Sequence, residues 1–224
     1  MNDALLSRVR VQVPSRPGER TSAEYLRHQA VASLFLGQDE ARPLYRVLEE
    51  SGGASTLLVL SSVPPRRTSE IAPGRWVGEV VTKRFAPPLK PGQGVDFDLV
   101  VNAASVVTDG AGRKRRVDVW DVVFASKDHE DVDRADVYAA WLSRQLNGAA
   151  ELVSGQVAER GLMRVRRPGR EAPMVFVRTR IIGALTVRQP AELTALLVRG
   201  IGRARAFGCG LMCLLPAGRL HRRP

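Results

Sequence analysis

The chain has 224 residues, of which 44% are hydrophobic, and a formal net charge of +11 with an isoelectric point near 10.8. This length suits one large or two small domains with a packed core, and the charge favours a polyanionic partner, nucleic acid first and a membrane surface second. Charged residues interrupt the apolar N-terminus, no apolar run reaches the roughly 18 residues of a membrane span, and only two cysteines occur. These features argue against a secreted or membrane-spanning protein, so we expect a cytoplasmic one.

The beginning of the chain predicts a strand followed by a helix. Residues 5–13 alternate valine with arginine or glutamine, a pattern typical of a strand with one buried face. Thr21 and Glu24 have the spacing of a capping box, so we expect a helix over residues 22–36. Its predicted buried stripe consists of Leu26, Ala30 and Leu34.

The next segment predicts a hairpin and ends in a linker. Two apolar runs within residues 44–60 flank a glycine turn, as in a pair of antiparallel strands. A loop at 64–73 and a weaker strand at 75–85 complete a first domain, expected over residues 1–85. Residues 86–94 contain three prolines and two glycines, which is the composition of a linker.

A second domain is expected over residues 95–216, followed by a tail at 217–224. Its first strand, residues 95–101, begins with alternating apolar and acidic residues. A loop from Ala103 carries the basic run at residues 113–116. The remaining elements are expected as an acid-rich loop, a helix, two strands, a helix and a strand, at residues 125–136, 133–147, 160–165, 173–187, 191–199 and 211–215. The residues expected to pack from the longer helix are Val137, Ala140, Trp141 and Leu142.

The order of these elements predicts the fold class. Strand, helix, strand, strand, helix and strand is the order of a ferredoxin-like unit, which RNA-binding RRM modules share. We therefore expect an α+β protein with two tandem ferredoxin-like (RRM-like) domains joined by the Pro/Gly linker. Topology alone does not establish a function.

Tyr25 and His28 are the candidate catalytic residues. They stand at i and i+3 on the predicted helix, away from its apolar stripe, so their side chains are neighbours. Histidine transfers protons near neutral pH, although a single helical histidine is more often structural or solvated. The other two histidines, His129 and His221, fall in the acid-rich loop and in the tail.

The basic residues are clustered rather than evenly spread. Between Arg160 and Arg188 there are eight arginines and one acid, on a predicted hairpin whose turn is Arg-Arg-Pro-Gly-Arg at residues 166–170. A basic hairpin end suits the phosphates that line a nucleic-acid groove, and the alternative is a solvated hairpin in an arginine-rich protein. The candidate RNA-binding residues in these basic segments are Lys114, Arg115, Arg116, Arg164, Arg166, Arg167 and Arg170.

The segment GIGRARAFGCG at residues 200–210 is the candidate anion-binding loop. Glycine backbones approach a phosphate closely, and arginine adds a permanent positive charge. Its candidate RNA-binding residues are Gly202, Arg203, Arg205 and Gly208. The alternative is a glycine-rich turn that leads into a buried strand. No metal site is expected, because no set of cysteine and histidine ligands surrounds Cys209 and Cys213.

Taken together, these motifs resemble the CasE type of CRISPR repeat-RNA endoribonucleases from the type I-E Cascade complex. The resemblance rests on the C-terminal GIGRARAFGCGLMCLLP and on EYLRHQAVASLF, which has the family's Tyr-x-x-His-Gln spacing. It is supported, in order along nearly the whole chain, by Arg46, the Lys90-Pro91-Gly92 turn, Asn102 and the Trp141-Leu142 pair.

The resemblance implies a fold and an activity. It implies two ferredoxin-like domains and metal-free, cofactor-free cleavage of precursor CRISPR RNA just after a stem-loop, with the product hairpin retained in the Cascade complex. Tyr25 and His28 then correspond to active-site residues, and the basic hairpin and the glycine loop contact RNA. The expected partners are the repeat RNA and other Cascade subunits, with no membrane.

Two other functions are compatible with parts of the pattern. A structural RNA-binding subunit without catalysis would share the basic hairpin and the glycine loop, and would leave the Tyr25–His28 pair without a role. Membrane-surface binding is a poorer explanation, because the arginines lie in turns and loops rather than along an amphipathic helix.

Overall fold

The computed structural model describes residues 4–12, 21–66, 80–126 and 131–220. The chain forms two compact units. Unit 1 comprises Met1–Pro87, Arg164–Val175 and Ala204–Leu211, and unit 2 comprises the rest of the chain. Along the chain, unit 1 gives way to unit 2 between Pro87 and Pro88, and the end of the basic hairpin and most of the glycine loop group with unit 1.

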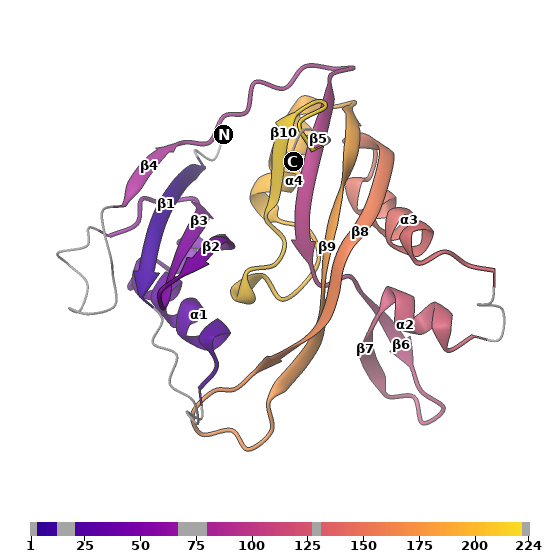
Figure 1. The fold of residues 1–224 in the computed structure, drawn as a ribbon, viewed down its shortest axis with the longest axis horizontal. Coiled ribbons are helices and arrows are strands. Elements are labelled where there is room, and N and C mark those ends of the chain that lie inside the picture. The colour runs from indigo at the N-terminus through magenta and orange to yellow at the C-terminus, as the bar shows by residue number, and fades with distance from the viewer. Residues whose placement is uncertain (1–3, 13–20, 67–79, 127–130, 221–224) are drawn as a thin grey trace. The chain divides into compact units, whose positions relative to one another are not determined.

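Unit 1 is built on a four-stranded antiparallel sheet with strand order β2-β3-β1-β4 (Figure 1). This is the strand order of a ferredoxin-like domain. Its elements are β1 (Leu5–Gln12), α1 (Ala23–Ser33), a short 3-10 helix η1 (Asp39–Ala41), β2 (Leu44–Ser51), β3 (Ala54–Ser61) and β4 (Val81–Arg84).

The alternation read in β1 decides which face of this sheet is buried. Val9 and Val11 are buried, whereas Arg8 and Arg10 between and beside them are exposed. Val9 pairs with Leu57 of β3, which is also buried, so one face of the sheet is apolar. The core of unit 1 consists of Val9, Val11, Ala30, Val31, Leu34, Phe35, Ala41, Tyr45, Leu57 and Val59, with Leu26 partly buried against it.

Helix α1 begins one residue later than the capping-box pattern predicts. Its N-cap is Ser22, whose hydroxyl accepts a hydrogen bond from the backbone N–H of Tyr25. In a capping box, the side chain at the third helical position would satisfy the backbone N–H of the N-cap. Here the backbone carbonyl of Arg166 satisfies the N–H of Ser22, at 3.1 Å, so the Thr21–Glu24 assignment was wrong.

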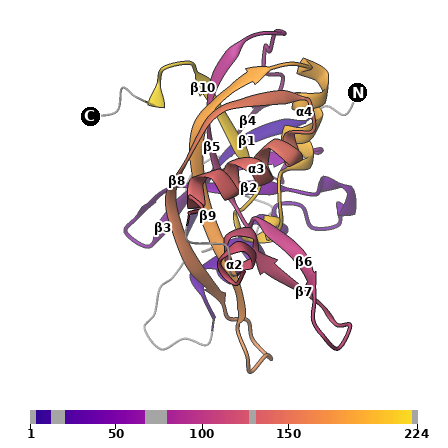
Figure 2. The same cartoon turned by 90° about the vertical axis from the view of Figure 1, so that its right-hand side faces the viewer.

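Unit 2 repeats the ferredoxin-like arrangement with strand order β10-β5-β9-β8. Helix α3 lies across this sheet (Figure 2). The elements of this ferredoxin-like part of unit 2 are β5 (Gly94–Val101), α3 (Arg134–Leu146), β8 (Ala150–Val165), β9 (Met174–Val187), α4 (Pro190–Arg199) and β10 (Met212–Pro216). The largest fully buried side chains of unit 2 are Phe97, Leu99, Tyr138, Leu142, Leu146, Ile181, Leu185 and Leu193.

The predicted limits of α3 are correct to within one residue at each end. The carboxylate of Asp133 caps its first turn, and Asn147 ends it in the left-handed conformation. Trp141 and Leu142 are buried as expected, but Ala140 is exposed and Tyr138 is buried in its place. The strand expected at residues 160–165 is the last part of the single long strand β8, which begins at Ala150.

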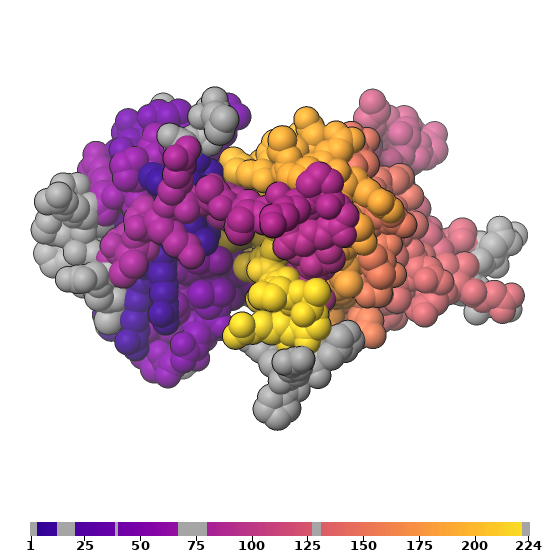
Figure 3. Space-filling view, turned by 90° about the horizontal axis from the view of Figure 1, so that it is seen from above, coloured from indigo at the N-terminus to yellow at the C-terminus, as the bar shows by residue number. Residues whose placement is uncertain are grey.

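An insertion between β5 and α3 replaces the loop expected from Ala103. It consists of the hairpin β6 (Ala104–Thr108) and β7 (Lys114–Asp118), followed by the short helix α2 (Val119–Phe124). The end of the hairpin extends away from the sheet of unit 2 (Figure 2), and its atoms form a separate group at the edge of the space-filling view (Figure 3). The basic run therefore lies mainly on a strand, where its side chains point alternately to the two faces.

Some expectations fall partly or wholly outside the described residues. These are most of the loop at 64–73, the first part of the strand at 75–85, part of the acid-rich loop, and both His129 and His221. The expected linker, up to its last residue Gly94, has no helix or strand. The described part of the tail forms a turn, and the backbone N–H of Leu220 donates to Asp96 at 3.0 Å. Among the described helices, none combines the length and the apolar character needed to cross a membrane.

Candidate functional site

Tyr25 and His28 lie side by side on α1, as their spacing predicts. Their ring centroids are 6.2 Å apart, and the two ring planes are inclined by 50°. Both side chains are partly buried, so each has one side against the protein and one side open to a ligand. The phenol ring of Tyr25 and the imidazole of His28 are therefore close enough to contact the same ligand on the surface of unit 1.

The glycine loop brings a third ring to this pair. Within the loop, residues Arg205–Phe207 form the 3-10 turn η3, which packs against α1 and β2. The ring of Phe207 lies 5.4 Å from the ring of His28, and the backbone of Ala206 forms a hydrogen bond with the imidazole. Two segments that are far apart in the sequence therefore meet at His28.

The surroundings of His28 favour its neutral form. Burial lowers its pKa below the ordinary value of 6.5, and the hydrogen bond with Ala206 opposes that shift. A bond that favours the protonated ring must be accepted by a carbonyl oxygen, so one ring nitrogen of His28 donates its proton to Ala206. In the neutral ring, the second nitrogen then carries a lone pair and is able to accept a proton.

Gly208 allows the η3 turn to lie this close to the sheet. Its φ is +78°, and a Cβ atom at this position would lie 3.2 Å from Cε2 of the buried Tyr45. Burial raises the pKa of Tyr45 far above its usual value, so this hydroxyl keeps its proton. The glycine is thus required both by its backbone conformation and by the flat ring beneath it.

A buried arginine holds α1 on the sheet next to His28. Arg27 is only 8% exposed, and its guanidinium bonds to Glu50 of β2 and to the hydroxyl of Ser55 of β3, the latter at 3.1 Å. Glu24, one turn earlier on α1, lies 3.7 Å from the same guanidinium. Because a buried charge is costly unless it is paired, this network fixes the position of α1 along the sheet.

The basic hairpin starts at the N-terminus of α1. The hydroxyl of Ser22 accepts the backbone N–H of Arg166 at 3.3 Å, in addition to its capping bond to Tyr25. The carbonyl of Arg166 accepts the N–H of Ser22. The same serine therefore caps the helix and holds the hairpin about one turn of helix from the Tyr25–His28 pair.

The arginines of the chain divide into two groups by their contacts. Those with acidic partners hold the fold together; examples are Arg27, Arg160, Arg180 and Arg188. The hairpin arginines Arg164, Arg166, Arg167 and Arg170 are exposed and form no ion pair within the described residues. Unpaired, exposed cations next to a partly buried histidine are a suitable surface for phosphates.

The remaining candidate residues lie in unit 2. Arg203 is exposed, and its backbone N–H donates to the carbonyl of Asn102 at 3.2 Å. A Cβ atom on Gly202 would lie 2.5 Å from Val101, so this glycine lets the loop cross β5 closely. Lys114, Arg115 and Arg116 are exposed on β7. Tyr25, His28, Arg166, Arg205 and Gly208 thus belong to unit 1. The candidates in unit 2 are Lys114, Arg115, Arg116, Gly202 and Arg203.

The described residues contain no group of three or more histidine, cysteine, aspartate or glutamate side chains arranged to hold a metal ion. Cys209 is buried and Cys213 is partly buried, and neither takes part in a disulfide bond.

A family model described as "CRISPR associated protein" matches residues 5–216. The chain belongs to this family. The resemblance drawn from the sequence motifs is therefore confirmed. A curated relative, the CRISPR-associated endoribonuclease Cse3 of Thermus thermophilus, is 28% identical over 226 residues, which cover 94% of this chain and 99% of the relative.

Solved structures of the same family share the fold. A structure of CRISPR endoribonuclease Cse3 bound to a 19 nt RNA is 25% identical and has a TM-score of 0.70, covering 95% of this chain and 100% of that chain. The CRISPR-associated protein Cas6e from Escherichia coli K-12 is 23% identical with a TM-score of 0.62, covering 94% and 99% of the two chains. The prediction of two ferredoxin-like domains in an α+β fold is confirmed.

Sequence reasoning missed several residues of the site in this CRISPR-associated protein. Phe207 was noted only as part of the glycine motif, although it is the single aromatic residue of that loop. Ser22 was passed over in favour of Thr21, and nothing in the local pattern indicates that Arg166 would complete its hydrogen bonds. In the sequence, Arg27 is simply a polar residue on a helix and Tyr45 an aromatic residue on a strand, so no pattern indicates their contacts at the site.

Gly208→Ala is expected to destabilise the protein more than Gly218→Ala. Both glycines have φ near +78°, so both substitutions cost about 1–2 kcal/mol in backbone strain. Only Gly208 has a neighbour, the ring of Tyr45, and the added contact costs about 1–3 kcal/mol more in the free energy of unfolding. Urea denaturation of the two variants measures the difference, and equal losses would show that the ring of Tyr45 does not restrict the loop.

Proposed function

We propose that this protein is a metal-independent endoribonuclease that cuts precursor CRISPR RNA within the repeat, at the 3′ base of its stem-loop. After cleavage it keeps the product hairpin and remains a subunit of the CRISPR surveillance complex. The observation that carries the proposal is the convergence of Tyr25, His28 and the η3 turn beside the unpaired arginines of the hairpin. The name of the relative Cse3, an endoribonuclease, and the RNA in its solved structure support it.

The chemistry needs groups that the site contains. RNA cleaves itself when its 2′-hydroxyl loses a proton and attacks the adjacent phosphorus, so no metal-activated water is required. The reaction then needs a base for the 2′-hydroxyl, an acid for the leaving 5′-oxygen and positive charge for the phosphorane. The products are a 2′,3′-cyclic phosphate and a 5′-hydroxyl.

In this proposal His28 is the general base. Its lowered pKa keeps the ring neutral at pH 7, and its bond to Ala206 leaves the other nitrogen able to take the proton of the 2′-hydroxyl. Tyr25, whose ring is 6.2 Å away, orients the 2′-hydroxyl or stabilises the developing charge. Arginine cannot release a proton at neutral pH, so Arg166, Arg167 and Arg170 contribute charge rather than acid catalysis.

The first test is the variant His28→Ala. Cleavage of a stem-loop repeat RNA under single-turnover conditions should fall by about 10²–10⁴-fold, because the base acts only in the transition state. Binding of the same RNA should change by less than about 1 kcal/mol. The neighbouring Gln29→Ala is the matched control for effects on the helix, and should cleave normally. Unchanged cleavage by His28→Ala would leave a structural RNA-binding subunit as the better account.

The dependence of cleavage on pH tests the role given to His28. If His28 is the base, the single-turnover rate constant should rise with pH and level off above an apparent pKa lower than 6.5, because burial disfavours the protonated ring. A substrate with a bridging 5′-sulfur, whose leaving group needs no proton, should not rescue His28→Ala. A rate that falls above that pKa, together with such a rescue, would make His28 the acid instead.

The double variant Arg166→Ala with Arg167→Ala tests the hairpin. Each lost phosphate contact lowers the slope of log affinity against log salt by about 0.7–0.9, so the slope should fall by about 1.4–1.8. The control variant Arg144→Ala with Arg199→Ala removes two exposed cations from the last turns of α3 and α4. A slope that changes equally in both variants would show that only net charge matters.

A further inference from the structure

The β6–β7 hairpin and α2 form an insertion that the proposed chemistry does not use. On β7, Lys114 and Arg116 point to one face and Arg115 to the other, and all three are exposed. Lys114 and Arg116 form no ion pair within the described residues, whereas Arg113 is paired with Asp109 at the turn. The insertion therefore presents two cations without an ion-pair partner, Lys114 and Arg116, on one face of β7.

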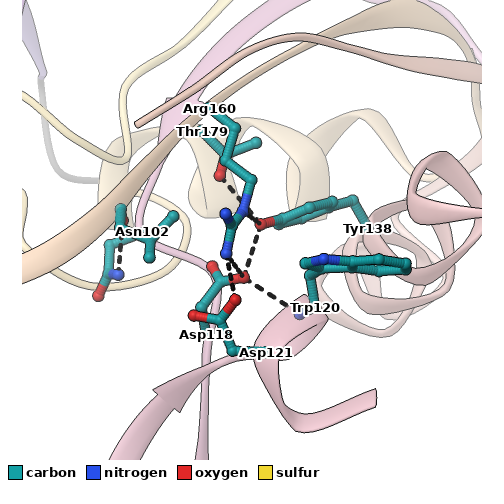
Figure 4. Close-up of polar contacts among 8 residues, drawn as sticks. Asn102, Asp118, Trp120, Asp121, Tyr138, Arg160 and Thr179 are labelled. Carbon is teal, nitrogen blue, oxygen red and sulfur yellow. Dashed lines mark hydrogen bonds and ion pairs between the residues drawn. The ribbon is translucent and has the colours of Figure 1, made fainter. Parts of the chain in front are cut away.

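A buried polar network fixes the base of this hairpin on unit 2. Figure 4 shows Asp118, at the end of β7, accepting hydrogen bonds from the hydroxyl of Tyr138 at 2.7 Å and from the backbone N–H of Trp120 at 3.1 Å. Arg160 of β8 bonds to Asp118, Asp121 and the hydroxyl of Tyr138. Burial raises the pKa of Tyr138 to about 12, so its hydroxyl stays protonated and remains a donor. Because Tyr138 of α3 and Arg160 of β8 both bond to Asp118, the end of strand β7 has a defined position on unit 2.

The insertion also presents aromatic rings. Trp120 and Phe124 lie one turn apart on α2, with ring centroids 6.0 Å apart. Phe124 is 57% exposed, and within the described residues it is the one aromatic side chain among the exposed large hydrophobic ones. The guanidinium of Arg134 lies over the ring of Trp120 at 5.0 Å. A ring that is open on one side and close to cations is a platform on which an unpaired base can stack.

We propose that this insertion binds a single-stranded segment of the RNA that flanks the stem-loop. Cations that follow the phosphates and exposed rings that stack on bases are the two features by which proteins hold single strands. A base inside a duplex is already stacked on its neighbours, so the rings favour unpaired RNA over the stem. The inference rests on the proposed function, since it extends the same RNA substrate to a second surface.

The test compares a stem-loop RNA with and without an unpaired flank of about ten nucleotides, placed in turn on each side of the stem. A single 2′-deoxy residue before the cut prevents cleavage during the binding measurement. With one of the flanks, the wild-type protein should bind at least about 5-fold more tightly, the effect of one stacked base. Lys114→Ala with Arg116→Ala should remove most of this gain and lower its salt slope by about 1.4. The charge-matched Arg144→Ala with Arg199→Ala should keep the gain.

A second variant separates stacking from charge. Phe124→Ala removes an exposed side chain, so the fold should persist, and the gain from the flank should fall at least about 5-fold with an unchanged salt slope. The proposal is wrong if neither flank adds affinity, if the Lys114/Arg116 and Phe124 variants keep the whole gain, or if the charge-matched control loses as much. An insertion that binds a protein partner instead of RNA would leave the gain unchanged in these variants. In each case binding and cleavage of the bare stem-loop would still test the proposed function separately.

Discussion

The candidate site exists because the glycine loop can lie flat on the ring of Tyr45. Gly208 has no side chain to hold the loop away, and its left-handed backbone turns the chain so that the Ala206 carbonyl and the Phe207 ring meet His28. The imidazole is thereby given one fixed hydrogen bond and one free nitrogen. Arg27 bonds to Glu50 of β2 and Ser55 of β3, and so holds helix α1, which carries His28, on the sheet. Both the glycine loop and the helix that meet at His28 are therefore fixed in position.

The pairing of arginines gives physical meaning to a composition that is otherwise ambiguous. A high arginine content alone says little about function. In this protein several buried and half-buried arginines have carboxylate partners, as Arg160 has Asp118 and Asp121, and these pairs join elements of the fold. The hairpin cations Arg166, Arg167 and Arg170 are exposed and have no such partner within the described residues. Because these guanidinium groups are already exposed and form no ion pair with the described residues, they are available to bind an external polyanion.

Local patterns predicted the two sheets well, since alternation in β1 and β5 and the glycine turn between β2 and β3 are properties of neighbouring residues. The same patterns placed Tyr25 beside His28, because i and i+3 are neighbours on any helix. They could not show that Arg166 would complete the cap at Ser22, or that Phe207 would reach His28, since both contacts join segments far apart in the chain. The β6–β7 hairpin was not predicted, because the consecutive basic residues of β7 have a composition that is typical of loops.

The measurement that tests the account most directly uses two RNAs in the presence of EDTA. One is a stem-loop repeat RNA, and the other is identical except for a single 2′-deoxy residue just before the expected cut. We predict that the first RNA is cleaved to a 2′,3′-cyclic phosphate and a 5′-hydroxyl, and that the second is bound equally tightly and stays intact. Cleavage of the deoxy substrate, or loss of all cleavage in EDTA, would contradict attack by the 2′-hydroxyl with His28 as its base.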